Sequence, residues 1–535
     1  MTSIPHRAST ANKHRRQTTA ILTSLLAAAL TLTACSAQTS PTEGDGAGAG
    51  AAKPELTIAA QSDPGTLDPA LINQAAQWYT DLAYAPLIQT SSDGTTRPSL
   101  ATEWGYVGEG NTTFELKLRP DVKFSDGGEL TAQGVADHLT YVKNAGGQMA
   151  ASLATFETIE ATEPLTVRVT LSQPNPELIY LFAQSGVGIS QVISPDGLAN
   201  TDKLGAETHG AGPYVLDAGA TITGDTYVYL PNPNYWDPDN IHWAKVTIKV
   251  IPNINSVLSA LRSGQADFAQ GDFTTAAAAK EAGLTTHFVP QVFQGLALND
   301  RDGAMAPALG DIRVRQAINY ALDREAITQA LLGETGIPTT QTVNGVGFVP
   351  ELDDYYPYDP DKARALLAEA GHGDGLQIST LSTPFASGDM VTQAIAGQLS
   401  EVGIELVVES VADANEFFNL MATAAYPVAW IGFGSMPMYL EGINLFMPGA
   451  LFNPFRTEDA QITDLYNQLA VASQDEIEPI SQAIETRLVE LAWFAPVAWV
   501  PLGQYATDKI DPEAVTTTTG ASPIVAIIDL KPAGS

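Results

Sequence analysis

Apolar and polar residues alternate with two different periods along this chain, and this predicts interleaved strands and helices. Residues 56–60, 114–118 and 246–251 follow the two-residue period of a half-buried strand. Residues 312–322 follow the helical period behind Asp311, whose side chain can cap the first turn. Their apolar face leaves Arg313, Arg315 and Gln316 pointing outward.

The second half of the chain carries the clearest helix boundaries. Asp323 can cap a second helix that contains Ile327 and Leu331, and a further helix begins at Asp359 with Pro360 and ends at Gly371. Apolar residues between 391 and 399 predict a further helix, which Gly403 separates from a strand at 404–408. Helices followed by strands are typical of an α/β lobe.

The N-terminal segment has the order of an export signal. Basic residues precede an apolar run from Ala20 to Ala34 that is too short for a membrane span. Leu32-Thr33-Ala34-Cys35 resembles a bacterial lipobox, so we expect residues 1–34 to be a lipoprotein signal peptide and the Cys35 thiol to receive a diacylglycerol such as one containing palmitate. The alternative for this only cysteine is a free thiol. The number of acyl chains is left open.

Composition separates a tether from a large folded region. Residues 35–53 are rich in Gly, Ala, Ser and Thr, and we expect them to form a flexible tether. Almost five hundred residues follow, which predicts at least two lobes. The chain has a formal net charge of −34, so it repels phosphate backbones and we expect no nucleic-acid partner.

Motifs for catalysis and metal binding are missing from the sequence. There is no Gly-x-Ser-x-Gly elbow, no phosphate-binding loop and no His-Glu-x-x-His helix. Beyond the signal segment the histidines are widely spaced, and we expect structural or surface roles for them. The sequence therefore predicts no enzyme, no metal and no cofactor, although distant residues could still converge in space.

A series of segments in one order resembles the family 5 extracellular solute-binding proteins, the oligopeptide, dipeptide and nickel receptors of ATP-binding cassette (ABC) importers. The resemblance runs from about Leu56 to Leu502 and rests on these segments: 66–69 (Thr-Leu-Asp-Pro), 84–87 (Tyr-Ala-Pro-Leu), 98–104, 114–119, 122–127 (Val-Lys-Phe-Ser-Asp-Gly), 130–132, 210–214 (Gly-Ala-Gly-Pro-Tyr), 232–236, 261–267 and 311–324.

The resemblance implies a two-lobed α/β fold like that of periplasmic binding proteins, of class II and with an extra inserted subdomain. We expect the main lobe at 54–97, 213–290 and 500–535, the inserted subdomain at 98–212 and the second lobe at 291–499. The chain would cross between lobes near 291–294 and 499–502. A ligand cleft between the lobes would close around the solute.

Position in this fold also suggests residues facing the cleft. The expected ligand-binding set comes from the loop after the first strand, the crossing strand and a segment near residue 430: Gln61, Gln74, Trp78, Phe293, Gln294, Trp430, Gly432, Phe433 and Met436. Aromatic and amide side chains suit a mixed polar and apolar solute. Ordinary core packing is the alternative for Trp78, Phe293 and Trp430.

One departure from the family bears on the ligand. Peptide-binding members carry an Asp that pairs with the peptide amine, and Met436 occupies the matching place here. Glu441 lies nearby and could substitute, with a surface carboxylate as the alternative. Peptides, metal chelates, saccharides and other solutes therefore stay open.

The sequence predicts a non-catalytic receptor that captures a peptide-like or other bulky solute and delivers it to an ABC permease and its ATPase. We expect a monomer, lipid-anchored on the outer face of the cytoplasmic membrane. A sensor lipoprotein that signals to a partner and a hydrolase on a similar shell are the alternatives. The affinity and the cognate permease cannot be deduced from the sequence.

Overall fold

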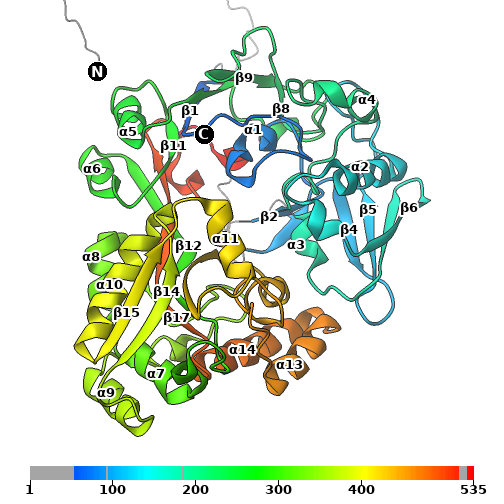
Figure 1. Ribbon diagram of the computed structural model, residues 1–535. Coiled ribbons are helices and arrows are strands. Elements are labelled where there is room, and N and C mark those ends of the chain that lie inside the picture. The colour runs from blue at the N-terminus through cyan, green and yellow to red at the C-terminus, as the bar shows by residue number, and fades with distance from the viewer. Residues whose placement is uncertain (1–52, 92–93, 184–185, 517–526, 535) are drawn as a thin grey trace, which may run out of the picture. The chain divides into compact units, whose positions relative to one another are not determined.

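The computed structural model describes residues 53–91, 94–183, 186–516 and 527–534 (Figure 1). The expected signal peptide, Cys35 and nearly all of the expected tether lie outside these ranges. The described residues all belong to one unit of the chain, residues 52–535. None of their helices is long and apolar enough to cross a membrane.

One large mixed sheet runs through the described chain. Its strands, in spatial order, are β15 (Ile404–Ser410), β14 (Leu376–Ser382), β16 (Val428–Gly434), β12 (Thr285–Leu298), β17 (Phe494–Ala506), β11 (Phe268–Gly271), β1 (Glu55–Ala60), β10 (Lys245–Val250), β9 (Thr226–Pro231) and β8 (Tyr214–Leu216), with β13 (Ile337–Pro338) pairing to β17. The strands expected at 56–60, 246–251 and 404–408 are confirmed, each within three residues of the predicted bounds.

The two longest strands, β12 and β17, join the halves of this sheet. They pair antiparallel from Thr285 with Ala506 to Ala297 with Phe494. The early part of β12 pairs with the part of β17 that also contacts β11, whereas residues from Val292 onward pair on their other side with β16. Both strands therefore pass from one half of the sheet to the other, and in Figure 1 they occupy its centre.

A second, four-stranded antiparallel sheet lies apart from the first. It contains β4 (Ala101–Tyr106), β5 (Thr113–Leu118), β7 (Thr166–Leu171) and β6 (Phe156–Glu163), with α2 (Ala132–Ala145) packed on β6 and β7 (Figure 1). Thr131 caps α2 by accepting a hydrogen bond from the Gly134 N–H. β2 (Ile88–Thr90) and β3 (Thr96–Pro98) form a separate hairpin.

Several other helices begin at an Asp side chain, and the caps predicted at Asp311, Asp323 and Asp359 are confirmed. Asp311, Asp323, Asp359, Asp413 and Asp459 each accept a backbone N–H from the first turn of the helix that follows. The helices are α1 (Trp78–Asp81), α3 (Leu178–Phe182), α4 (Pro195–Ala199), α5 (Ile254–Arg262), α6 (Ala276–Glu281), α7 (Ile312–Tyr320), α8 (Arg324–Leu332), α9 (Pro360–Glu369), α10 (Gly388–Glu401), α11 (Ala414–Ala422), α12 (Met438–Glu441), α13 (Ala460–Ala470) and α14 (Gln474–Glu490).

The expected outward position of Arg315 is wrong. This side chain is buried, and its guanidinium donates hydrogen bonds to the carbonyls of Leu309 and Leu491 at 2.6 and 3.1 Å. Arg313 and Gln316 are half-buried on the same helix. A guanidinium can be buried where backbone carbonyls satisfy its donors, and helical periodicity does not reveal such partners.

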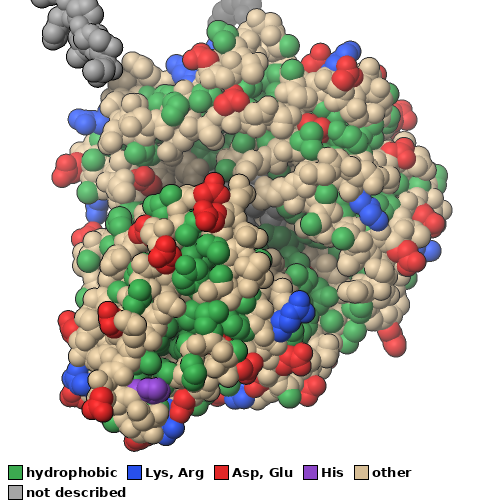
Figure 2. Space-filling model, viewed as in Figure 1, with side chains coloured by type: hydrophobic (Ala, Val, Ile, Leu, Met, Phe, Trp, Pro, Cys, Tyr) green, Lys and Arg blue, Asp and Glu red, His purple; other side chains and the backbone are tan. Residues whose placement is uncertain are grey.

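Buried apolar side chains gather in separate groups. The largest contains residues between Phe293 and Trp499, and two others surround the early strands of the large sheet. A fourth is built around α2 and the four-stranded sheet. On the face drawn in Figure 2 acidic side chains outnumber basic ones, in keeping with the net charge of −34.

Gly295 marks the closest approach of the two crossing strands. A Cβ at this position would lie 2.2 Å from the Ala495 carbonyl oxygen and 2.7 Å from the Pro496 Cα. The pairing register also shifts between Gln294 and Gly295, so the backbones meet at an irregularity. Backbone atoms cannot yield as a flexible side-chain end can.

Replacing Gly295 by Ala is therefore expected to lower the free energy of unfolding by roughly 1–3 kcal/mol, measured from urea denaturation midpoints. Gly105→Ala is the matched control, because Gly105 also lies in a strand but a Cβ there meets nothing within 4 Å. Equal stability of the two variants would contradict the close approach at Gly295.

Candidate functional site: a cavity at the strand crossing

An apolar cavity of about 200 Å³ lies where β12 and β17 pass between the halves of the sheet. Its walls come from these two strands, α8, the start of α10 with the residues before it, and one residue after β11. The lining residues are Phe273, Val292, Gln294, Ile327, Thr328, Leu331, Leu332, Ala386, Ser387, Met390, Val391, Val497, Ala498 and Val500. None of them carries a charge.

Gln294 is the most polar group of this wall. Its side chain is 5% exposed, and its Nε2 donates a 3.0 Å hydrogen bond to the Ala386 carbonyl. Because a carbonyl can only accept, the amide nitrogen must face Ala386 and the Oε1 acceptor is left over. That Oε1 is buried and has no hydrogen-bond partner among the described residues.

Two further buried polar atoms near the cavity also lack partners within the described chain: the Thr328 Oγ1 and the Trp430 Nε1. Thr328 lines the cavity and is 3% exposed. The Trp430 ring lies behind Gly388, where a Cβ would approach it to 2.9 Å. Most buried polar groups in proteins are paired, so such atoms are typical of a site that awaits a ligand or water.

The wall segment before α10 has an unusual backbone. Ala386 and Ser387 have φ angles of 48° and 64°, in the left-handed region that residues with a Cβ seldom adopt. Such conformations cost free energy and cluster at ligand sites, where the surrounding structure holds them. The hydrogen bond from Gln294 to Ala386 fixes this segment against β12.

The nine expected ligand-binding residues occupy different places. Gln294 lines the cavity, and Trp430 backs the wall before α10. Gly432, Phe433 and Met436 are half-buried along and after β16, which pairs with β12.

Phe293 and Trp78 belong to the apolar core. Phe293 is fully buried with its ring centroid 5.5 Å from that of Trp499, and Trp78 packs on Phe268 at 5.8 Å. Gln61 is exposed directly after β1, and Gln74 begins a short 3-10 turn. Both lie in the loop region expected for them, and Gln61 does not line the cavity.

Sequence reasoning did not find the helical part of the wall. Thr328 and Leu331 on α8, and Met390 and Val391 on α10, read as ordinary positions of amphipathic helices. Phe273 follows β11 in a segment without a motif. No signal in the sequence distinguishes these residues from core, because only the packing of helices on the sheet leaves a space beside them.

Glu441 is not on the surface, so the surface alternative is wrong. Its side chain is fully buried beside that of Glu485, and Thr342 Oγ1 lies 3.4 Å from the Glu441 Oε2 and 2.8 Å from the Glu485 Oε2. Burial, with the nearby Glu485, raises the pKa of Glu441 well above its ordinary value. Burial also raises the pKa of Glu485 to about 7. A buried carboxyl with a raised pKa is held neutral.

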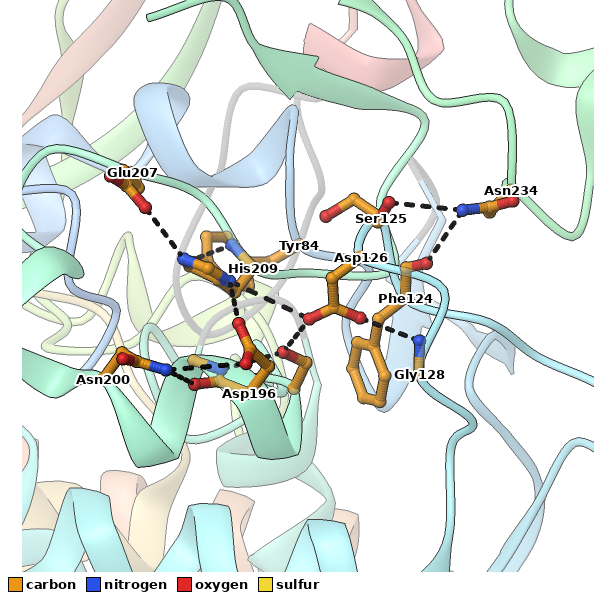
Figure 3. Close-up of polar contacts among 12 residues, drawn as sticks. Tyr84, Phe124, Ser125, Asp126, Gly128, Asp196, Asn200, Glu207, His209 and Asn234 are labelled. Carbon is orange, nitrogen blue, oxygen red and sulfur yellow. Dashed lines mark hydrogen bonds and ion pairs between the residues drawn. The ribbon is translucent and has the colours of Figure 1, made fainter.

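A separate polar cluster lies around His209 (Figure 3). Asp126, Asp196 and His209 are the group within the described ranges whose side-chain donors could hold a metal ion. The His209 Nδ1 lies 3.8 Å from a carboxylate oxygen of each Asp, and its Nε2 lies 3.5 Å from Glu207. The sequence placed these residues apart and expected no metal.

The contacts of this cluster already serve the fold. Asp126 accepts hydrogen bonds from the Gly128 N–H and the Ser194 hydroxyl, and Ser194 caps α4 by accepting from the Gly197 N–H. The Asp196 side chain is 64% exposed. The turn at Asp126 is thereby tied to α4, and none of these residues lines the cavity.

The fold places the chain in a class of binding proteins. The computed structure resembles that of MppA, a periplasmic murein tripeptide binding protein in an unliganded open form, with a TM-score of 0.77 and 19% identity over 90% of this chain and 97% of that one. It also resembles NikA from Brucella suis in complex with Fe(III)-EDTA, with a TM-score of 0.74 and 24% identity over 90% and 100% of the two chains. The class is that of two-lobed periplasmic binding proteins.

Sequence comparison identifies the family within that class. Residues 95–446 match the bacterial extracellular solute-binding proteins, family 5 Middle. The glutathione-binding protein GsiB of Salmonella paratyphi A is 29% identical over 367 residues, which cover 66% of this chain and 68% of that protein. The chain belongs to the family 5 extracellular solute-binding proteins, which bind solutes for ABC importers and are not enzymes.

Proposed function

We propose that this protein captures a peptide-like or other bulky solute outside the cell and delivers it to an ABC permease and its ATPase by closing two lobes around it. The carrying observation is an uncharged cavity at the crossing of β12 and β17, in a chain of family 5. The named relatives include a glutathione-binding protein and a tripeptide-binding protein. Glutathione and short peptides are therefore the first solutes to test.

The lobe boundaries are part of this proposal. The main lobe would comprise 54–97, 213–290 and 500–535, the inserted subdomain 98–212 and the second lobe 291–499. The separate apolar groups support this division, because the largest of them draws its buried members from Phe293 to Trp499. We also propose that the protein is a monomer, because of its resemblance to the family 5 solute-binding proteins.

Contacts far from the crossing strands support closure. Glu177, before α3, accepts hydrogen bonds from the backbone N–H groups of Tyr439 and Leu440 at 3.1 and 3.3 Å. Asn111, between β4 and β5, donates to the carbonyls of Ala470 and Ala472 at the end of α13. These bonds join the proposed subdomain to the proposed second lobe, and they support the proposal that the two lobes close on each other.

The first test is solute binding by the purified chain from residue 36 onward. We expect glutathione or one of a set of short peptides to raise the midpoint of thermal unfolding and to be recovered chemically unchanged. Ligand at one hundred times its Kd should stabilise the protein by about 2.7 kcal/mol. Hydrolysis of the solute would favour the hydrolase alternative, and unchanged uptake after gene deletion would favour the sensor alternative.

Membrane attachment through Cys35 is proposed from the sequence. Cells fed a labelled palmitate are expected to incorporate the label into the wild-type chain but not into Cys35→Ser, since the diacylglycerol is attached to the thiol. Ser36→Ala, which alters the next residue and keeps the thiol, should retain the label. Label in the Cys35→Ser chain would refute the anchor.

The Glu177 contact predicts a dependence of stability on pH. Burial raises the pKa of Glu177 from 4.5 to about 8, so the folded protein keeps a proton that the unfolded chain loses. The stabilisation from this neutral group is complete below pH 4.5 and is lost as the pH rises through about 8. The pKa values of Glu441 and Glu485 are raised as well. The pH dependence of the wild type alone therefore cannot isolate the contribution of Glu177.

The effect is isolated by comparing the wild type with Glu177→Gln. Between pH 5 and pH 8 we expect the wild type to lose at least about 1.4 kcal/mol more unfolding free energy than the variant, the equivalent of one pKa unit. Urea denaturation at both pH values measures the difference. Glu157→Gln, which removes an exposed carboxylate from β6, should behave as the wild type. Parallel pH profiles for the wild type and Glu177→Gln would contradict a buried neutral Glu177.

A further inference from the structure

The chemistry of the cavity narrows the class of solute, provided that the proposed receptor function holds. The walls consist of aliphatic, aromatic and small side chains, with Gln294, Thr328 and Ser387 as the polar members. An ionised group placed there would lose its hydration without gaining an opposite charge. The lining therefore selects against charged groups.

The size of the cavity indicates how much of a solute it holds. Its volume is about 200 Å³, below the range of roughly 300–1,000 Å³ for sites that enclose a drug-sized ligand. An apolar cavity of about 150 Å³ suffices to bind benzene. One branched aliphatic or aromatic group fits, and the rest of a larger solute must lie outside this space.

The unpartnered polar atoms indicate the hydrogen bonds that such a solute makes. Gln294 Oε1 is a fixed acceptor, because its Nε2 is engaged by the Ala386 carbonyl. Thr328 Oγ1 is buried without a partner among the described residues and can donate or accept. A neutral amide or hydroxyl beside the apolar group would satisfy both atoms and relieve the cost of leaving them unpaired.

Glu441, the carboxylate that follows β16, is not available to bind an ammonium group. Met436, which follows this strand, is uncharged, and Glu441 is fully buried with its Oε1 3.4 Å from the Met436 backbone nitrogen. A neutral, enclosed Glu441 offers neither charge nor access. Recognition of a free amine at this place is thus disfavoured.

We propose that the cavity receives an uncharged apolar group of isobutyl or phenyl size from a neutral solute, and that Gln294 and Thr328 determine specificity by binding a polar group next to it. The solute class is a neutral amide, such as a blocked or internally linked apolar peptide. Solutes whose buried group is charged are rejected.

The test uses the chain from residue 36 onward and four blocked peptides, acetyl-Ala-X-Ala-amide with X as Leu, Phe, Lys or Glu, in isothermal titration calorimetry. We expect the Leu or Phe peptide to bind at least tenfold more tightly than the Lys and Glu peptides. Thr328→Val, which keeps the shape of the side chain and removes the hydroxyl, should lower the affinity for the preferred peptide about five- to tenfold.

A charge introduced at the wall should change the preference. Met390 lines the cavity and is 52% exposed, so Met390→Glu adds a carboxylate at little cost to folding. In this variant the affinity for the Lys peptide is expected to come within about threefold of the affinity for the Leu peptide. Met305→Glu is the matched control, because Met305 is 48% exposed and is not part of this cavity, and it should leave the order of affinities unchanged.

The outcomes separate this inference from the receptor function. Equal or tighter binding of the Lys or Glu peptide to the wild type overturns the inference while the receptor function stands. The inference is likewise overturned, and the receptor function stands, if glutathione binds and none of the four blocked peptides does. If the chain binds none of the solutes in either assay, both proposals fail. An unchanged affinity in Thr328→Val refutes the role of Thr328.

Discussion

The antiparallel pairing of β12 with β17 is the constraint on which the rest of this structure depends. These strands share hydrogen bonds from Thr285 to Ala297, so the two halves of the large sheet cannot be separated without breaking the pairing. Gly295 lets the backbones meet at a register shift, where the Ala495 carbonyl leaves no room for a Cβ. The cavity forms beside this crossing because strand residues with small or branched side chains face two helices there. The position of the site thus follows from the covalent path between the halves.

The surface and the cavity have opposite electrostatic character. The chain has a net charge of −34, yet the walls of the cavity contain no ionisable residue. Two acidic residues inside the protein, Glu441 and Glu177, are buried and have raised pKa values. Solubility and solute recognition are therefore served by different residues: exposed carboxylates keep the protein hydrated, and an uncharged interior selects what enters.

Polar groups inside the protein are used in two ways. Arg324, the buried first residue of α8, donates to the carbonyls of Thr339 and Pro496 and so ties distant segments together. The cluster at His209 and Asp126 joins a turn to the cap of α4. In contrast, Gln294 and Thr328 keep atoms without partners within the described chain. Satisfied groups stabilise the fold, whereas unsatisfied groups at a cavity lower stability and are expected where a ligand completes the bonding.

The sequence by itself determined the elements, because caps and periodicity are local. Asp311, Asp323 and Asp359 begin the predicted helices, the strands predicted at 56–60 and 404–408 are present, and ordered motifs identify the family. Only the tertiary structure decided which face of a helix meets a cavity and which polar groups are enclosed. Arg315 and Glu441 were expected at the surface, and both are buried because distant segments supply their partners. Thr328 and Met390 join Gln294 only through packing, which depends on contacts between residues far apart in the chain.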